Sequence, residues 1–211
     1  MKIVVFGSGF VGTAIARELA DRGHAVTVVS RSGKAAPPAP IVPVTGSVHD
    51  AAFVNSVTSG ADVLVSALPA VSPDGDLGAS VAALVRAAQA GGARLGVVGG
   101  ASILPMAPGG PRQGDTPEFP ARFAPLTDAH QHALDRLSSA PDGVDWFYLV
   151  PAAEFGPHDP GARTGTYRTS SASHVTDADG HSRLGLHDFA VAFADEIEHP
   201  RTHRNWLAIG Y

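Results

Sequence analysis

The stretch VVFGSGFVGTAIARELADRGHAVTVVSRS, from Val4 to Ser32, decides the fold. The apolar, mostly β-branched residues 3–6 indicate a buried strand, and glycines follow it at once. Apolar residues then recur at helical spacing over residues 12–21, and residues 25–29 indicate a second strand. A strand, a glycine turn, a helix and a second strand form the repeating unit of open α/β sheets.

The rest of the chain repeats this alternation of strand and helix. Further strands are expected at residues 41–44, 62–67, 94–98, 146–150 and 205–209, and further helices at residues 50–59, 77–90, 127–139 and 187–198. This order predicts an α/β fold, a Rossmann-type doubly wound parallel sheet with helices on both faces, in a single domain over residues 1–211. Approximately residues 153–186 are irregular, and we expect them to form a small substrate-side appendage with short strands around 166–168 and 174–176.

The composition excludes several classes of protein. The 211 residues include no cysteine, which excludes disulfides, thiolate metal sites and cysteine nucleophiles. The formal net charge is −5, so we expect no nucleic-acid partner. No apolar run approaches the ~20 residues of a membrane span, and Gly7 and Gly9 cut the first run too short for a signal peptide. We therefore expect a cytoplasmic protein without a membrane partner, and the sequence predicts no oligomeric state.

The glycine turn predicts a bound dinucleotide. Gly7-Ser8-Gly9-Phe10-Val11-Gly12 matches G-x-G-x-x-G between a strand and a helix, the context that makes this pattern specific. Gly7 allows the tight turn, Gly9 lets a pyrophosphate approach the backbone, and Gly12 lets helix and strand pack closely. The helix N-terminus offers unpaired N–H groups to the phosphates. The alternative is a tight turn beside an empty crevice.

The end of the second strand indicates which dinucleotide binds. A site for NAD(H) places Asp or Glu there, about 20 residues after the glycines. This chain has Ser30-Arg31-Ser32 instead. Arg31 suits a 2′-phosphate and the serines can donate hydrogen bonds, so we expect NADP(H) to be preferred over NAD(H). The alternative for Arg31 is a surface arginine in an exposed loop.

Several catalytic motifs are absent. Lys2 and Lys34 are the two lysines, and both precede every tyrosine, which excludes the Tyr-x-x-x-Lys pair of many epimerases and short-chain dehydrogenases. The chain has no G-x-S-x-G nucleophile elbow and no H-E-x-x-H zinc motif. The histidines show no zinc-ligand spacing, so we expect no metal site.

Six segments together resemble the atypical short-chain dehydrogenase/reductases that bind NAD(P)H, in particular the YwnB-like proteins and the biliverdin reductase B/flavin reductase group. They are the glycine turn, Val97-Val98-Gly99-Gly100-Ala101-Ser102, Leu126-Thr127-Asp128-Ala129-His130, residues 145–152 (DWFYLVPA), residues 161–168 (GARTGTYR) and His187-Asp188-Phe189-Ala190. The chain departs from the family in two places. Its glycine turn is shorter than the common G-x-x-G-x-x-G, and Gly46-Ser47-Val48 stands where many members carry an acid.

The resemblance implies that a nicotinamide lies across the carboxyl ends of the strands, where ligands bind in open α/β sheets. The residues implied to line that crevice are Ala67, Leu68, Pro69, Gly99, Gly100, Pro151, Ala152 and Ala153. It also implies that Ser102 and His130 face the substrate. Ser102 would then donate a hydrogen bond to substrate or nicotinamide amide, and His130 would donate or relay a proton. The alternatives are a turn serine and a solvated helix histidine.

Two functions remain open at this point. One is an NADPH-dependent reductase that transfers hydride to a flavin, quinone or small carbonyl compound, with a small-molecule electron acceptor as its partner. The other is a dinucleotide-binding sensor or regulator of the NmrA type without catalysis. The Ser102 and His130 pair favours the reductase. The proline-rich residues 104–125 are either a lid over the substrate or a stiff surface connection.

Overall fold

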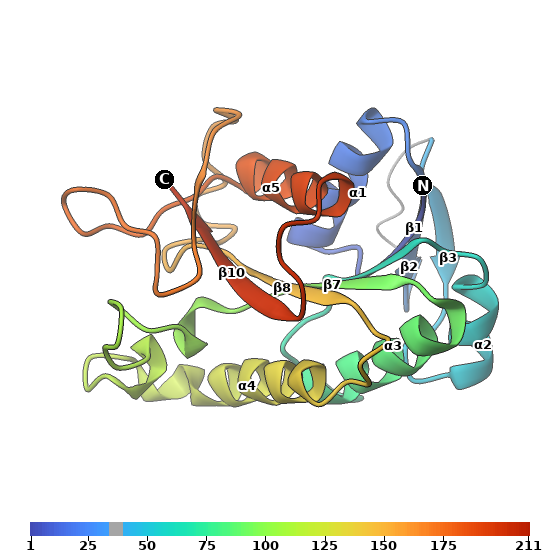
Figure 1. The fold of residues 1–211 in the computed structure, drawn as a ribbon, viewed down its shortest axis with the longest axis horizontal. Coiled ribbons are helices and arrows are strands. Elements are labelled where there is room, and N and C mark those ends of the chain that lie inside the picture. Colours follow the sequence, from blue (N-terminus) through green and yellow to red (C-terminus); the bar gives the residue numbers. More distant parts are fainter. Residues whose placement is uncertain (34–39) are drawn as a thin grey trace.

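An eight-stranded sheet runs through the centre of the computed structural model, which describes residues 1–33 and 40–211 (Figure 1). In sheet order the strands are β3 (Val42–Thr45), β2 (Ala25–Ser30), β1 (Lys2–Phe6), β4 (Val63–Ser66), β7 (Arg94–Val98), β8 (Trp146–Val150), β10 (Asn205–Gly210) and β9 (Arg168–Ser170). Neighbouring strands are parallel except at the edge, where β9 pairs antiparallel with β10. The strand order is that of a doubly wound sheet.

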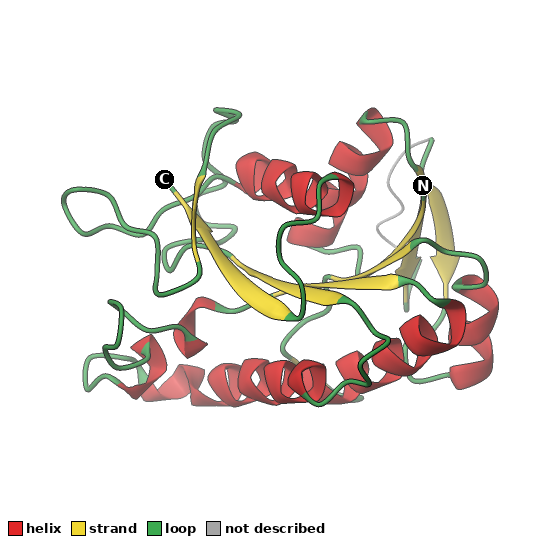
Figure 2. Cartoon of the chain, in the orientation of Figure 1, coloured by secondary structure: helices red, strands yellow, loops and turns green. Residues whose placement is uncertain are grey.

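Helices cover both faces of this sheet (Figure 2). On one face lie α1 (Phe10–Asp21) and α5 (Leu186–Glu198), and on the other lie α2 (Ala51–Val57), α3 (Leu77–Gly91) and α4 (Ala124–Ser138). Helices α1 and α5 contact each other, as do α3 and α4. The prediction of a Rossmann-type α/β fold is therefore confirmed.

Each face of the sheet has its own hydrophobic core. Val4 and Phe6 of β1 pack in the core between the sheet and helices α3 and α4. Ile3 and Val5 pack in the core between the sheet and helices α1 and α5. Because side chains alternate along a strand, the strands must be apolar at every position to bury both faces. In β8 this alternation points Tyr148 toward the side of α4.

Three local features differ from the sequence-based expectations. The short strand of the appendage lies at β9 (Arg168–Ser170), and residues 174–176 form none; His174 N–H donates to Pro105 O in the proline-rich segment at 3.0 Å. Helix α4 begins at Ala124, before the predicted residue 127, with a proline in its first turn, where proline is tolerated. A small hairpin of β5 (Val71–Ser72) and β6 (Gly75–Asp76) precedes α3. Its two-residue strands are too short to leave a periodic signal.

The edges of the sheet are short strands. At one edge β3 has four residues and includes the exposed Pro43. At the other edge β9 has three residues. Within residues 1–33 and 40–211, no helix is long and apolar enough to cross a membrane.

Candidate functional site

A cavity of about 710 Å³ opens at the carboxyl ends of β1, β2 and β4. It is within the size range of small-molecule and cofactor sites. The sequence-predicted residues that line it are Gly7, Ser8, Gly9, Phe10, Val11, Ser30, Arg31, Ser32, Ala67, Leu68 and Pro69. The structure thus brings together the glycine turn, the end of β2 and the segment after β4, which lie far apart in the sequence.

The first and last glycines of the turn are explained by the chain's own packing. Gly7 has φ +114°, and a Cβ there would lie 2.2 Å from Ala67 O. Gly12 does not line the cavity, and a Cβ there would lie 2.0 Å from Gly7 O. Any side chain at either position would force the start of α1 away from β1 and β4.

The middle glycine is different. A Cβ at Gly9 would have no neighbour within 4 Å, so packing does not require glycine there. Gly9 is the N-cap of α1, no side chain caps this end, and the first turn carries no acidic residue. Backbone N–H groups at a helix N-terminus attract anions, and the open space beside Gly9 lets an anion reach them. The pyrophosphate of a dinucleotide therefore fits these residues.

Arg31 extends from the end of β2 along the cavity wall, with its side chain 55% exposed. It forms an ion pair with Asp74, a cavity residue from the turn between β5 and β6. Ser30 uses its hydroxyl locally, because Gly33 N–H donates to Ser30 Oγ at 3.2 Å. Asp74 follows Arg31 by 43 residues, and no sequence pattern connects the two.

The segment after β3 also lines the cavity, which sequence reasoning missed. Gly46, Ser47, Val48 and His49 belong to the wall. A Cβ at Gly46 would lie 2.2 Å from the ring of Phe53, so this glycine is required by packing against α2. The signal was available in the sequence, since the carboxyl end of every parallel strand meets the same edge of the sheet.

The predicted residues after β7 and β8 do not line this cavity; they are Gly99, Gly100, Pro151, Ala152 and Ala153. A Cβ at Gly99 would lie 2.5 Å from Tyr148 Cε1, and one at Gly100 would lie 2.3 Å from His130 Cδ2. Both glycines are thus explained by the side chains packed against them. Ala153 N–H donates to Ser182 Oγ at 3.0 Å, which joins this edge to the appendage.

Ser102 and His130 lie in one polar cluster with Thr127 and Tyr148. Ser102 belongs to a 3-10 turn (Ala101–Ile103) after β7, and its hydroxyl oxygen accepts a hydrogen bond from Thr127 at 2.9 Å. His130 Nδ1 lies 2.8 Å from the Tyr148 hydroxyl. Thr127 and His130 are three residues apart on α4 and therefore share a helix face.

Burial keeps the cluster uncharged. It lowers the pKa of His130 to about 4 and raises the pKa of the Tyr148 hydroxyl above its ordinary value. At neutral pH the imidazole is therefore neutral and carries a single N–H. A Cβ built at Gly100 would lie 2.6 Å from His130 Nε2, so this nitrogen faces the chain at the carboxyl end of β7. A neutral ring with this nitrogen at the carboxyl end of β7 can donate or accept one hydrogen bond there.

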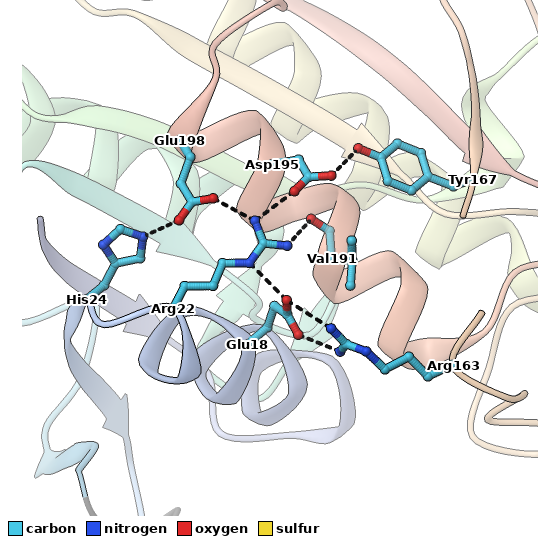
Figure 3. Close-up of polar contacts among 8 residues, drawn as sticks. All are labelled: Glu18, Arg22, His24, Arg163, Tyr167, Val191, Asp195 and Glu198. Atoms are coloured by element: carbon cyan, nitrogen blue, oxygen red, sulfur yellow. Dashed lines mark hydrogen bonds and ion pairs between the residues drawn. The ribbon is translucent and has the colours of Figure 1, made fainter. Parts of the chain in front are cut away.

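A network of ion pairs fastens the appendage to α1 and α5 (Figure 3). Arg163 of the appendage contacts Glu18 of α1 at 2.6 Å, and Arg22 contacts Glu18 at 2.9 Å. Burial opposes ionisation of Glu18, but the two arginines hold its pKa below the usual value. Arg22 also reaches Asp195 of α5 at 2.7 Å. Because α1 begins at the cavity, these contacts fix the position of the appendage relative to it.

The network extends further along α5. The Tyr167 hydroxyl of the appendage donates to Asp195 at 2.6 Å. Arg22 and His24 both contact Glu198, at 2.6 and 2.8 Å. Figure 3 shows that Arg22 lies at the centre of these groups, between the two helices. A planar guanidinium with several donors suits such a position.

The proline-rich segment of residues 104–125 is folded back on itself. Gln113 N–H donates to Leu104 O at 2.9 Å, and Met106 N–H donates to Pro111 O at 3.0 Å. Arg112 Nη1 donates to Gln131 of α4 at 2.8 Å. These contacts attach the segment to α4 beside the Ser102 and His130 cluster.

Comparison with known proteins agrees with this geometry. Residues 7–196 match the model of a family described as NAD(P)H-binding. The uncharacterized protein YwnB of Bacillus subtilis (strain 168) is 32% identical over 211 residues, which cover 97% of this chain and 95% of YwnB. This identity extends over both halves of the sheet.

Two solved structures have closely similar folds. A provisionally named NADH-flavin reductase of Streptococcus pneumoniae is 29% identical, with a TM-score of 0.86 and coverage of 100% of this chain and 99% of that one. A provisionally named epimerase of Bacteroides thetaiotaomicron is 33% identical, with a TM-score of 0.86 and coverage of 100% and 96%. The glycine turn, the cavity beside it and these matches lead to one conclusion: the chain belongs to the NAD(P)H-binding family of Rossmann-fold proteins.

Proposed function

We propose that this chain is an NADPH-dependent reductase that transfers hydride to a flavin, quinone or small carbonyl compound. The observation that carries the proposal is the cavity, which is lined both by the uncapped start of α1 at Gly9 and by Arg31. The first suits a pyrophosphate and the second suits a 2′-phosphate. The similarity to a provisionally named NADH-flavin reductase supports the reductase chemistry, and Arg31 is the ground for preferring NADPH.

The residues of the chain divide the work between binding and chemistry. Gly9 and the start of α1 hold the pyrophosphate, and Arg31 holds the 2′-phosphate. A bound nicotinamide supplies the hydride. His130 and Ser102, at the carboxyl end of β7, stabilise the negative charge that builds on the reduced acceptor. The neutral imidazole serves as a hydrogen-bond donor there, because burial disfavours its protonated form.

One observation favours a second candidate, a dinucleotide sensor without catalysis. The hydroxyl of Ser102 is bonded to Thr127, and Nδ1 of His130 is bonded to Tyr148. Side chains engaged with each other in this way stabilise the fold whether or not a substrate binds. The cytoplasmic location expected from the sequence stays a prediction.

Oxidation of NADPH by the purified protein tests the proposal. NADPH is mixed with FMN, menadione or a panel of small aldehydes, with NADH in parallel, and the nicotinamide absorbance is followed. We expect acceptor-dependent oxidation that Ser102→Ala and His130→Ala reduce at least ~10²-fold, the usual cost of removing one hydrogen-bond donor to developing negative charge. The control variants are Ser138→Ala and His187→Ala, whose side chains are exposed on α4 and α5. NADPH binding without turnover on any acceptor would favour the sensor, and faster turnover with NADH would show that Arg31 does not select the coenzyme.

A further inference from the structure

Arg31 and Asp74 form a pair of opposite charges in the lining of the cavity. Both residues line it, and their side chains form an ion pair. Arg31 comes from the end of β2, whereas Asp74 comes from the turn between β5 and β6. The side chains are 55% and 48% exposed, so a ligand in the cavity can reach both. Within residues 1–33 and 40–211, the guanidinium of Arg31 has its ion pair with this carboxylate alone.

The turn that carries Asp74 is rigidly built. Ser72 Oγ accepts from Asp74 N–H at 3.3 Å and donates to Gly75 O at 3.0 Å. Gly75 has φ +134°, which a residue with a side chain rarely adopts. Leu77 N–H donates to Ala70 O at 2.8 Å and closes the base of the hairpin. The carboxylate is therefore presented toward Arg31 by fixed backbone.

The hairpin of β5 and β6 also contacts helices α3 and α4. Asp76 caps α3 by accepting from Ala79 N–H at 2.8 Å, and it contacts His132 of α4 at 3.0 Å. The hydrogen bond from His132 holds the pKa of Asp76 below its usual range. Asp74 thus lies on an element anchored at both α3 and α4, and its position does not depend on a bound ligand.

A carboxylate and a phosphate monoester make the same kind of contact with a guanidinium, through oxygen atoms that accept from its planar N–H groups. The two anions also repel each other. We propose that Asp74 is a specificity-determining residue: it occupies Arg31 as an internal substitute for a phosphate, so that a 2′-phosphate binds only by displacing it. Asp74 thereby weakens the binding of NADPH and reduces the difference in affinity between NADPH and NADH. This inference rests on one part of the proposed function, the binding of a dinucleotide in the cavity. It does not require that the protein turns over a substrate.

Binding of two nucleotide fragments tests this inference. Titration calorimetry measures the affinities of 2′,5′-ADP, which carries the extra phosphate, and of 5′-ADP, which lacks it. We expect Asp74→Asn to tighten 2′,5′-ADP binding about fivefold, the size of a partly screened charge pair, and to leave 5′-ADP binding unchanged. In an Arg31→Leu background the same substitution should tighten 2′,5′-ADP binding much less than fivefold, because the competition for Arg31 is gone and direct repulsion between the two anions alone remains. Asp179→Asn, an exposed aspartate in the appendage, is the control.

The other outcomes overturn the inference in distinguishable ways. Equal affinities of wild type and Asp74→Asn for 2′,5′-ADP would show that the ion pair does not compete with the phosphate. Weaker binding of both fragments by the variant would show that Asp74 contacts the ligand directly. If neither fragment binds the wild type, the dinucleotide site and this inference both fail. The expected shift together with no NADPH oxidation would refute the reductase alone.

Discussion

The two halves of the sheet's carboxyl edge differ in whether their polar groups are hydrogen-bonded within the protein. Beside β1 and β2 the start of α1 is uncapped, and Gly9 leaves space that no protein atom fills. Beside β7 and β8 the polar side chains of Ser102 and His130 are bonded to neighbours in the protein. The first half is therefore shaped for a ligand before one arrives. The second half is a neutral, hydrogen-bonded cluster whose orientation is fixed by packing.

The largest effect is expected where a glycine serves packing alone. Gly12→Ala places a Cβ 2.0 Å from Gly7 O, a backbone atom of the turn that joins β1 to α1. We expect a loss of about 3 kcal/mol of unfolding free energy, near the upper end of overpacking costs. Chemical denaturation of the purified variant measures it. Gly91→Ala, at a position where the Cβ has open space, is the control. A loss below ~1 kcal/mol would show that the turn relaxes easily.

A smaller effect is expected in the second half, on lowering the pH. His130 has a pKa of about 4 in the folded protein against an ordinary 6.5, so the unfolded chain binds its proton first as pH falls. The stability that comes from the neutral ring is fully present above about pH 6.5 and is lost progressively toward about pH 4. Between about pH 7.5 and 5 the loss amounts to about 2 kcal/mol.

Denaturant unfolding of wild type and His130→Gln at both pH values isolates this contribution. The variant should lose about 2 kcal/mol less than wild type over the same interval. The matched comparison is the same measurement on a variant of His174. Burial lowers the pKa of His174 as well, and its Nε2 has no hydrogen-bond partner within the described residues. A pH dependence unchanged in His130→Gln would contradict the assignment of a neutral, buried imidazole.

The smallest effect is expected at Gly9, the glycine of the G-x-G-x-x-G turn that packing does not require. Gly9→Ala adds a methyl group that has no atom within 4 Å apart from those of its chain neighbours, at φ −78°, which alanine adopts readily. The unfolding free energy should stay within about 0.5 kcal/mol of wild type. Affinity for the dinucleotide should fall about tenfold, since the methyl group blocks the approach of the pyrophosphate to the backbone. Fluorescence titration with NADPH measures it, and unchanged affinity would place the ligand elsewhere.

The sequence predicted the longer strands and helices of this fold because each carries its own local signal, which the two-residue strands β5 and β6 do not. Buried strands such as β1 are continuous apolar runs, and the turn after it has glycines at fixed spacing. From these the sheet, its helices and the position of the cavity follow. The predicted roles of Ser102 and His130 in chemistry remain predictions.

The rest of the site depends on contacts between distant segments. Asp74 reaches Arg31 from 43 residues away, and Tyr148 reaches His130 across the gap between β8 and α4. Nothing in the period of a strand or helix specifies such partners. The structure alone also shows that Gly99 and Gly100 are surrounded by side chains, whereas Gly9 is not. All three positions are glycine in the sequence, so the atoms around each one decide whether the glycine serves packing or leaves space for a ligand.

The short outer strands have a consequence for how the molecule behaves when concentrated. An open sheet exposes unpaired backbone groups at both margins, which invite a strand from another molecule. Here one margin contains Pro43, which has no N–H to offer, and the other is the three-residue β9. Neither gives an incoming strand a long, regular template. We therefore expect little tendency to form fibrils or edge-to-edge aggregates while the native state persists.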